Sequence, residues 1–242
     1  MLALGLQLGK SKRSTAFTPA SIAGLQLWLD ASQITGLNDG DAVATWTDLS
    51  GNGYNATQGT ASARPTYQTA EQNSRAGVLA DGVDDYLAVT NPTLTDCTLF
   101  VVGRMSASTD AYNPPLSFRT VTPGIDVGAP FYLKSNNKWA SYPYFPTGGS
   151  LDDVGTSASG TAYVIEFPYE LAGWSLIVNG STLGSTTGTA YPSVAGVELF
   201  RQASPARYFN GFLFEVLVWN RVLTSNERTT VRAYLNSKWA VY

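Results

Sequence analysis

The chain has 242 residues, of which 44% are apolar and only 14% are charged, and its formal net charge is −3. It has no basic stretch that could follow a phosphate backbone, which excludes nucleic acid as an expected partner, and no run of roughly 18 apolar residues that could cross a bilayer. It has no histidine, which excludes nucleophilic triads that need an imidazole base and most zinc sites.

Residues 1–20 are predicted to form an N-terminal arm, and residues 21–242 a single domain. Leu2, Leu4, Leu6 and Leu8 alternate with other residues in a strand-like pattern. We expect this arm either to anchor on a neighbouring subunit or to remain a solvated terminus. The apolar start is too short for a secretory leader and its positive charges follow the apolar run, so we expect a protein kept in a cytoplasm or exported without a cleaved leader.

The body of the chain carries strand signals about every ten residues, as in a β-sandwich. Alternating apolar residues predict strands at 25–29, 43–46, 86–89 and 98–104, and the last is apolar enough to be central. Cys97 is the one cysteine, so no internal disulfide can form, and it is expected to be a buried small hydrophobe. Strands are also predicted on both sides of two turns, at 135–138 and at Asn179-Gly180. Residues 106–130 and 148–160 are expected to be surface loops.

The end of the chain predicts an apolar strand at 209–219 and a short docked helix. Thr224 and Glu227 have the Thr-x-x-Glu spacing of a capping box, in which each side chain satisfies the free amide of the other residue. Val231, Tyr234, Leu235 and Trp239 follow on one helical face.

Three stretches resemble one known family, and they occur in its order along the chain. They are GLQLWLDAS with TWTDLSGNGYNATQ (24–32 and 45–58), RPTY with DGVDDYLAV (64–67 and 81–89), and GFLFEVLVWNRVLTSNERTTVRAYLNSKW (211–239). They resemble laminin-G-like domains of the concanavalin A-like lectin/glucanase group. The resemblance implies an all-β fold, a two-sheet antiparallel jelly-roll sandwich with a short C-terminal helix. It implies no single function, because this fold hosts lectins, adhesion modules, glycoside hydrolases and structural proteins.

Carboxylates are the remaining route to catalysis. Glucanases of the resembled group carry a Glu-x-Asp-x-x-Glu triplet on one strand, and this chain lacks it. Glu166 and Glu215 each stand alone in an apolar strand, so we expect no catalytic residue and no enzyme. If Glu215 is buried it needs a partner, for which Arg201, Arg207 or Arg221 could serve.

Calcium is the one ion that the acidic residues could suit, because it binds oxygen ligands on turns. Asp39 and Asp41 form one cluster, and Asp81, Asp84 and Asp85 form another. Since Asp-Gly pairs are also the commonest turn residues, turn chemistry is the preferred interpretation, and we expect no metal site and no other cofactor.

The aromatic residues of the first hairpin are the candidate ligand-binding surface. Trp139, Tyr142 and Tyr144 lie in a stretch broken by proline, so we expect part of it to be exposed. Exposed rings of this kind stack on sugars or form subunit contacts, and the sequence does not separate the two uses.

Three functions remain as hypotheses. The first is a non-catalytic structural or adhesive protein of a bacteriophage virion (capsid decoration, head fibre or tail-associated receptor binding), because the chain opens like phage-encoded proteins with such an arm before FTPASIAGLQLWLDAS (17–32). It predicts contact with other virion proteins through the arm, a homo-oligomer, assembly in the host cytoplasm and binding of a host-surface glycan. The second is a bacterial carbohydrate-binding lectin module. The third is a glycoside hydrolase, which predicts two carboxylates facing one cleft.

Overall fold

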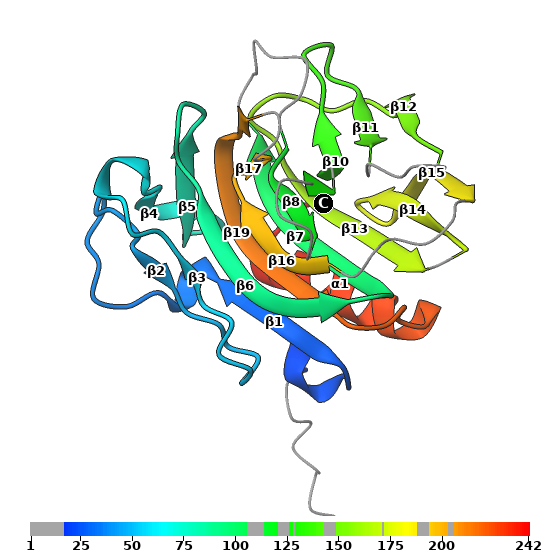
Figure 1. Cartoon of the computed structure of the whole chain (residues 1–242), viewed down its shortest axis with the longest axis horizontal. Helices are drawn as coiled ribbons and strands as arrows, with labels where there is room; N and C mark the ends of the chain where they lie inside the picture. Colours follow the sequence, from blue (N-terminus) through cyan, green and yellow to red (C-terminus); the bar gives the residue numbers. More distant parts are fainter. Residues whose placement is uncertain are drawn as a thin grey trace, which may run out of the picture.

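The computed structural model describes residues 17–105, 114–120, 126–127, 129–142, 149–170, 172–187, 194–202 and 206–242. These residues form antiparallel sheets stacked face to face and one C-terminal helix, which confirms the predicted all-β sandwich. Figure 1 shows strands of the six-stranded sheet in front of the larger, eight-stranded sheet, with the helix α1 on the far side of the larger sheet.

The larger sheet has eight strands in the order β15-β14-β13-β7-β19-β5-β4, and β1 also pairs with β19. Its central strands are apolar on both faces because they are covered on both sides. Its strands are β1 (Leu25–Asp30), β4 (Thr66–Gln72), β5 (Arg75–Asp81), β7 (Cys97–Met105), β13 (Ala162–Glu170), β14 (Gly173–Val178), β15 (Ser181–Thr187) and β19 (Asn210–Trp219).

The second sheet has six strands in the order β2-β3-β6-β16-β8-β9, and two smaller sheets accompany it. Its strands are β2 (Thr45–Trp46), β3 (Ala56–Thr57), β6 (Leu87–Leu94), β8 (Leu116–Thr120), β9 (Asp126–Val127) and β16 (Val194–Leu199). The smaller sheets are β10 (Ala129–Leu133), β11 (Trp139–Tyr142) and β12 (Leu151–Val154), and β17 (Arg201–Gln202) with β18 (Arg207–Tyr208). Three short 3₁₀ turns are η1 (Pro19–Ser21), η2 (Ala31–Gln33) and η3 (Ala61–Ala63).

Two apolar layers hold these elements together. One lies between the two large sheets, and the other lies between the larger sheet and α1 (Ser225–Trp239). Strand β19 serves both layers: Leu213, Val216 and Val218 face the first, whereas Phe214 and Leu217 face the second. The larger sheet is therefore the middle layer of the molecule.

Helix α1 begins as its sequence predicts. Thr224 caps it, and both hydrogen bonds of the capping box with Glu227 are present. Val231, Leu235 and Trp239 are buried against the sheet, which confirms the predicted apolar face. Among the described residues, no helix is both long and apolar enough to cross a membrane.

Most predicted strands and both predicted hairpins are present, and Cys97 is buried as expected. Asn137, Asn179 and Gly180 adopt the positive φ angles that tight turns require. Two predicted loop regions were wrong in part: 106–130 contains β8, β9 and the start of β10, and 148–160 contains β12. Polar composition concealed β12, because its residues are half-buried or exposed. The predicted arm lies outside the described residues up to position 16, and Pro19–Ser21 form η1.

Candidate functional site: an aromatic groove above a buried carboxylate

A surface groove of about 950 Å³ lies between α1 and the outer face of β1. Three half-buried aromatic residues contribute to its wall, namely Phe17, Trp28 and Tyr234. The rings of Phe17 and Tyr234 meet edge to face with their centroids 5.6 Å apart. Polar side chains from four elements complete the lining, among them Asp30 on β1, Gln33 on η2, Arg75 on β5, and Ser237 and Lys238 on α1.

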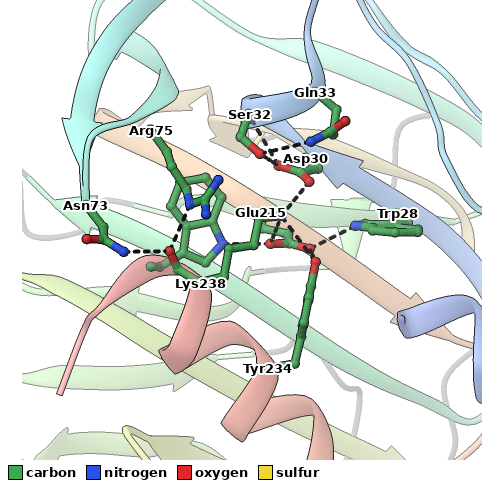
Figure 2. A network of polar contacts seen from close by, with 10 residues as sticks. Trp28, Asp30, Ser32, Gln33, Asn73, Arg75, Glu215, Tyr234 and Lys238 are labelled. Atoms are coloured by element: carbon green, nitrogen blue, oxygen red, sulfur yellow. Dashed lines mark hydrogen bonds and ion pairs between the residues drawn. The ribbon is translucent and has the colours of Figure 1, made fainter. Parts of the chain in front are cut away.

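Beneath the groove, the carboxylate of Glu215 is fully buried and accepts four hydrogen bonds. Its Oε1 accepts from Trp28 Nε1 at 2.8 Å and from the Tyr234 hydroxyl at 2.9 Å. Its Oε2 accepts from Lys238 Nζ at 2.8 Å and from Trp239 Nε1 at 2.6 Å. Figure 2 shows Trp28 of β1 and Tyr234 and Lys238 of α1 converging on Glu215.

A β-bulge in β19 is the reason that Glu215 points toward α1. Leu213 pairs with Gly103 of β7 and Glu215 pairs with Val102, so Phe214 is an extra residue on β19. Phe214 and Glu215 therefore both turn toward the helix, whereas regular alternation would send Glu215 into the layer between the sheets. A bulge of this kind re-aims a side chain without breaking the strand.

Lys238 is the cation of this site. Its ammonium group binds both Asp30 and Glu215, and it donates to the Tyr234 hydroxyl at 3.2 Å. These contacts use all three of its donors. The predicted partners of Glu215 were therefore wrong: Arg201 binds Glu198 and Arg221 binds Glu227, whereas Lys238 pairs with Glu215. Glu215 is buried and has a charged partner, as the sequence analysis requires of a buried Glu215.

The protonation of the site follows from its burial. Burial raises the pKa of Glu215 above its usual range, an effect that Asp30 reinforces and Lys238 opposes. Burial and the nearby Glu215 also raise the pKa of Tyr234, so its hydroxyl stays protonated near neutral pH and acts as a donor. The buried groups thus satisfy one another, which leaves the aromatic rings and the exposed polar side chains Gln33, Arg75 and Ser237 to face a ligand.

The aromatic residues that the sequence singled out do not form this site. Trp139 has 0% exposure and packs edge to face on Tyr163 in the layer between the sheets, with ring centroids 5.3 Å apart. The exposed platform expected at Trp139 is therefore corrected to a core position, because β13 of the larger sheet covers Trp139 through Tyr163. Tyr142 ends β11, and its side chain lies outside the described part of the structure, as does the whole of Tyr144.

Glu166 is also paired rather than alone. It is 1% exposed and binds Arg228 at 2.9 Å and Arg232, both on α1. Two buried carboxylates on the larger sheet, Glu166 and Glu215, thus hold the same helix. Only Glu215 touches the side chains of the groove.

The two acidic clusters differ in geometry. Asp41 accepts from the backbone amide of Asn38 within its own turn, as expected, whereas Asp39 accepts from the distant Thr69 of β4. The carboxylate oxygens of Asp81, Asp84 and Asp85 lie within 4.8 Å of one another. Burial and the two neighbouring carboxylates raise the pKa of Asp85 to about 6. Oxygen ligands of this kind are the ones that calcium takes, but the sequence favoured turn chemistry over a metal at this cluster, and that expectation stays untested.

Sequence reasoning missed Trp28, Asp30 and Tyr234 as site residues, although part of the signal was present. Gln26, Trp28 and Asp30 alternate with the buried Leu27 and Leu29, so their side chains share the outer face of β1. A tryptophan beside an aspartate on an outer strand face is a reasonable marker of a ligand surface. This pattern on β1 was not enough to predict the groove, because the opposite wall, with Tyr234, is formed by α1 at the far end of the chain.

No protein-family model matches the sequence, and no curated protein matches it. Solved structures do match. A sialidase of Trypanosoma rangeli in complex with the inhibitor DANA has a TM-score of 0.65 at 16% identity, over 90% of this chain and 35% of that chain. Domain 4 of AbnA, a GH43 extracellular arabinanase from Geobacillus stearothermophilus in complex with arabinotriose, has a TM-score of 0.59 at 16% identity, over 86% and 98%. The binding domain of Paraclostridial Mosquitocidal Protein 1 has a TM-score of 0.56 at 12% identity, over 88% and 53%.

The expectation that the chain is no enzyme is contradicted by these neighbours, because the sialidases among them are enzymes and the fold is glycosidase-like. That expectation rested on the missing histidine and the missing acidic triplet. Glycoside cleavage requires neither, since carboxylate spacings vary and sialidases use a tyrosine nucleophile. The chain spans about a third of the sialidase chains, so the likeness concerns one part of those proteins. At these identities the comparisons show the fold alone, which is a β-sandwich.

Proposed function

We propose that this chain is a carbohydrate-binding β-sandwich domain and that the groove between β1 and α1 is its sugar site. The observation that carries the proposal is the groove itself: three half-buried rings lie beside polar side chains that come from rigid elements. A sugar ring has apolar faces that stack on aromatic side chains and hydroxyl groups that bind polar ones. The volume of about 950 Å³ falls within the range of small-ligand sites.

The ligands bound in the structural neighbours support the same class of ligand. The arabinanase domain was solved with arabinotriose, and one T. rangeli sialidase structure contains sialic acid. The arabinanase domain is matched over nearly its whole length, so a fold of this size suffices for a sugar-binding unit. None of the neighbours described above supports the virion role that the sequence resemblance suggested, and that role stays a prediction, as do the anchoring arm and the homo-oligomer.

The test is a glycan array with the full chain, followed by calorimetric titration with arabinotriose and with sialic acid. Ala233→Arg places a long side chain in the groove from an exposed position of α1. Asn226→Arg adds the same charge at an exposed position of the same helix, but outside the groove, and is the control.

We expect Ala233→Arg to weaken glycan binding at least about tenfold, whereas Asn226→Arg binds like the parent chain. Binding that survives Ala233→Arg would place the sugar site elsewhere on the molecule. A parent chain that retains no glycan at all would refute the function.

A further inference from the structure

Two rings of the groove wall depend on a single buried oxygen atom. Trp28 comes from β1 and Tyr234 from α1, yet both donate to Oε1 of Glu215, at 2.8 and 2.9 Å. The other oxygen, Oε2, accepts from Lys238 and Trp239 at the end of the helix. One carboxylate therefore joins the two sides of the groove.

We propose that Glu215 is the positioning residue of this groove: it sets the orientation of Trp28 relative to Tyr234, and so the shape that a glycan meets. This inference rests on the proposed carbohydrate-binding function. Glu215 is fully buried under the rings and does not contact the ligand itself. It acts through the two side chains that do.

The chemistry of the site requires a carboxylate. An ionised glutamate is an acceptor only, with about four lone-pair sites on two oxygens, and here each oxygen accepts two hydrogen bonds. Glutamine has the same shape but offers one oxygen and one NH₂ group. If the NH₂ group replaces Oε2, it faces the ammonium of Lys238 and the indole N–H of Trp239, which are both donors only. If it replaces Oε1, the Tyr234 hydroxyl can rotate and accept from it, but the indole N–H of Trp28 is a donor only and loses its acceptor. In either orientation at least one indole N–H loses its hydrogen bond to residue 215.

Glu166 supplies the comparison that separates positioning from simple anchoring of the helix. It is also buried, also lies on the larger sheet and also binds two basic residues of α1. Its partners, Arg228 and Arg232, are not part of the groove lining. Loss of either carboxylate weakens the docking of α1, but only loss of Glu215 releases the rings.

The experiment compares Glu215→Gln, Glu166→Gln and Tyr234→Phe in the full chain, with arabinotriose and sialic acid as calorimetric probes. We expect Glu215→Gln to lose about tenfold or more in affinity and Tyr234→Phe to lose less, because its ring remains but its hydroxyl anchor is gone. Glu166→Gln should bind within about twofold of the parent chain, even though it is less stable. Folded Glu215→Gln with parental affinity, or an equal loss in Glu166→Gln, would overturn the inference.

A second measurement needs no glycan. The indole N–H resonances of Trp28 and Trp239 in a ¹⁵N-labelled chain, assigned with Trp→Phe variants, report their hydrogen bonds to Glu215 directly. Glu215→Gln should shift both, and Glu166→Gln should leave the Trp28 resonance in place. If the parent chain retains no glycan of the array, the proposed function fails while this measurement still decides the positioning role. If Glu215→Gln does not fold, Tyr234→Phe decides: an unchanged Trp28 resonance together with parental affinity refutes the coupling of the two rings.

Discussion

Asp30 and Glu215 lie directly opposite each other on the neighbouring strands β1 and β19, and the ammonium group of Lys238 binds both of them. Like charges in this position repel each other, and both carboxylates are almost completely removed from water. Lys238 stabilises the pair by supplying the opposite charge, so the end of α1 completes the electrostatics of the sheet beneath it. Stability and the candidate sugar site thus depend on the same few side chains.

Lys238→Met should destabilise the fold by about 3–5 kcal/mol, because it leaves two buried carboxylates without their cation. The loss should shrink as the pH falls, because protonation removes the uncompensated charge. Urea unfolding at several pH values measures both effects. Lys134→Met is the control: Lys134 pairs with the exposed Asp152 and Asp153, and such solvated pairs contribute little. Equal losses in the two variants would contradict the role assigned to Lys238.

Asp85 should make the protein more stable in mild acid. Its pKa rises from 3.8 to about 6 in the folded chain, mainly through burial. The folded state therefore holds a proton that the unfolded state releases between these values, and the free energy of unfolding falls as the pH rises from about 4 to about 6. Asp85→Asn should flatten this part of the profile, since its amide oxygen can still accept from the Asp81 amide. If the free energy of unfolding of Asp85→Asn falls with pH as steeply as that of the parent chain, other groups cause the pH dependence.

The same cluster allows a test of the expectation that no metal binds there. If Asp81, Asp84 and Asp85 hold calcium, the melting temperature should rise with added calcium in the parent chain and should not rise in Asp84→Asn. Magnesium is the control ion, because it needs a stricter geometry than three turn carboxylates provide. If the melting temperature of the parent chain does not change with calcium, a calcium site at these three carboxylates is excluded.

Thr224→Ala should cost about 1 kcal/mol of stability by removing the side-chain cap of α1. Ser225→Ala, one residue further along and exposed, is the control and should change stability little. Glu227, the partner of Thr224 in the cap, adds a dependence on pH. Arg221 and the capping contacts lower the pKa of Glu227 to about 2. Its contribution is therefore complete above about pH 4.5 and is lost as the pH falls toward 2. Chemical unfolding of both variants between these pH values tests the cap.

Trp139→Ala should behave as a core mutation and cost about 3–5 kcal/mol, with glycan affinity unchanged in the folded fraction. Trp139→Phe should cost much less, because Nε1 of Trp139 is buried without a hydrogen-bond partner among the described residues. Thermal unfolding and calorimetric titration of both variants distinguish this from the platform role first expected of Trp139. Loss of affinity in stably folded Trp139→Phe would restore that role.

Much of the architecture follows from local patterns. The period-2 alternation of Leu25, Leu27 and Leu29, the Asn179-Gly180 turn and the Thr224–Glu227 capping box each predict the element that the structure contains. These signals are local because hydrogen bonding of turns and caps involves residues a few positions apart. The β4–β5 hairpin was harder to predict as an element, because its turn residues Asn73 and Ser74 both adopt positive φ in a polar stretch without glycine.

The sequence by itself determined an all-β chain with a capped, amphipathic C-terminal helix, because alternation, turn residues and capping are properties of neighbouring positions. Only the tertiary structure decided that Glu215 faces α1, through the bulge at Phe214, and that Lys238 rather than Arg201, Arg207 or Arg221 neutralises it. It also decided that Trp139 is buried while Trp28 and Tyr234 reach a groove. The physical reason is that the burial and partner of a side chain depend on which distant strand or helix covers it, and strand register and helix docking set that contact across the whole chain.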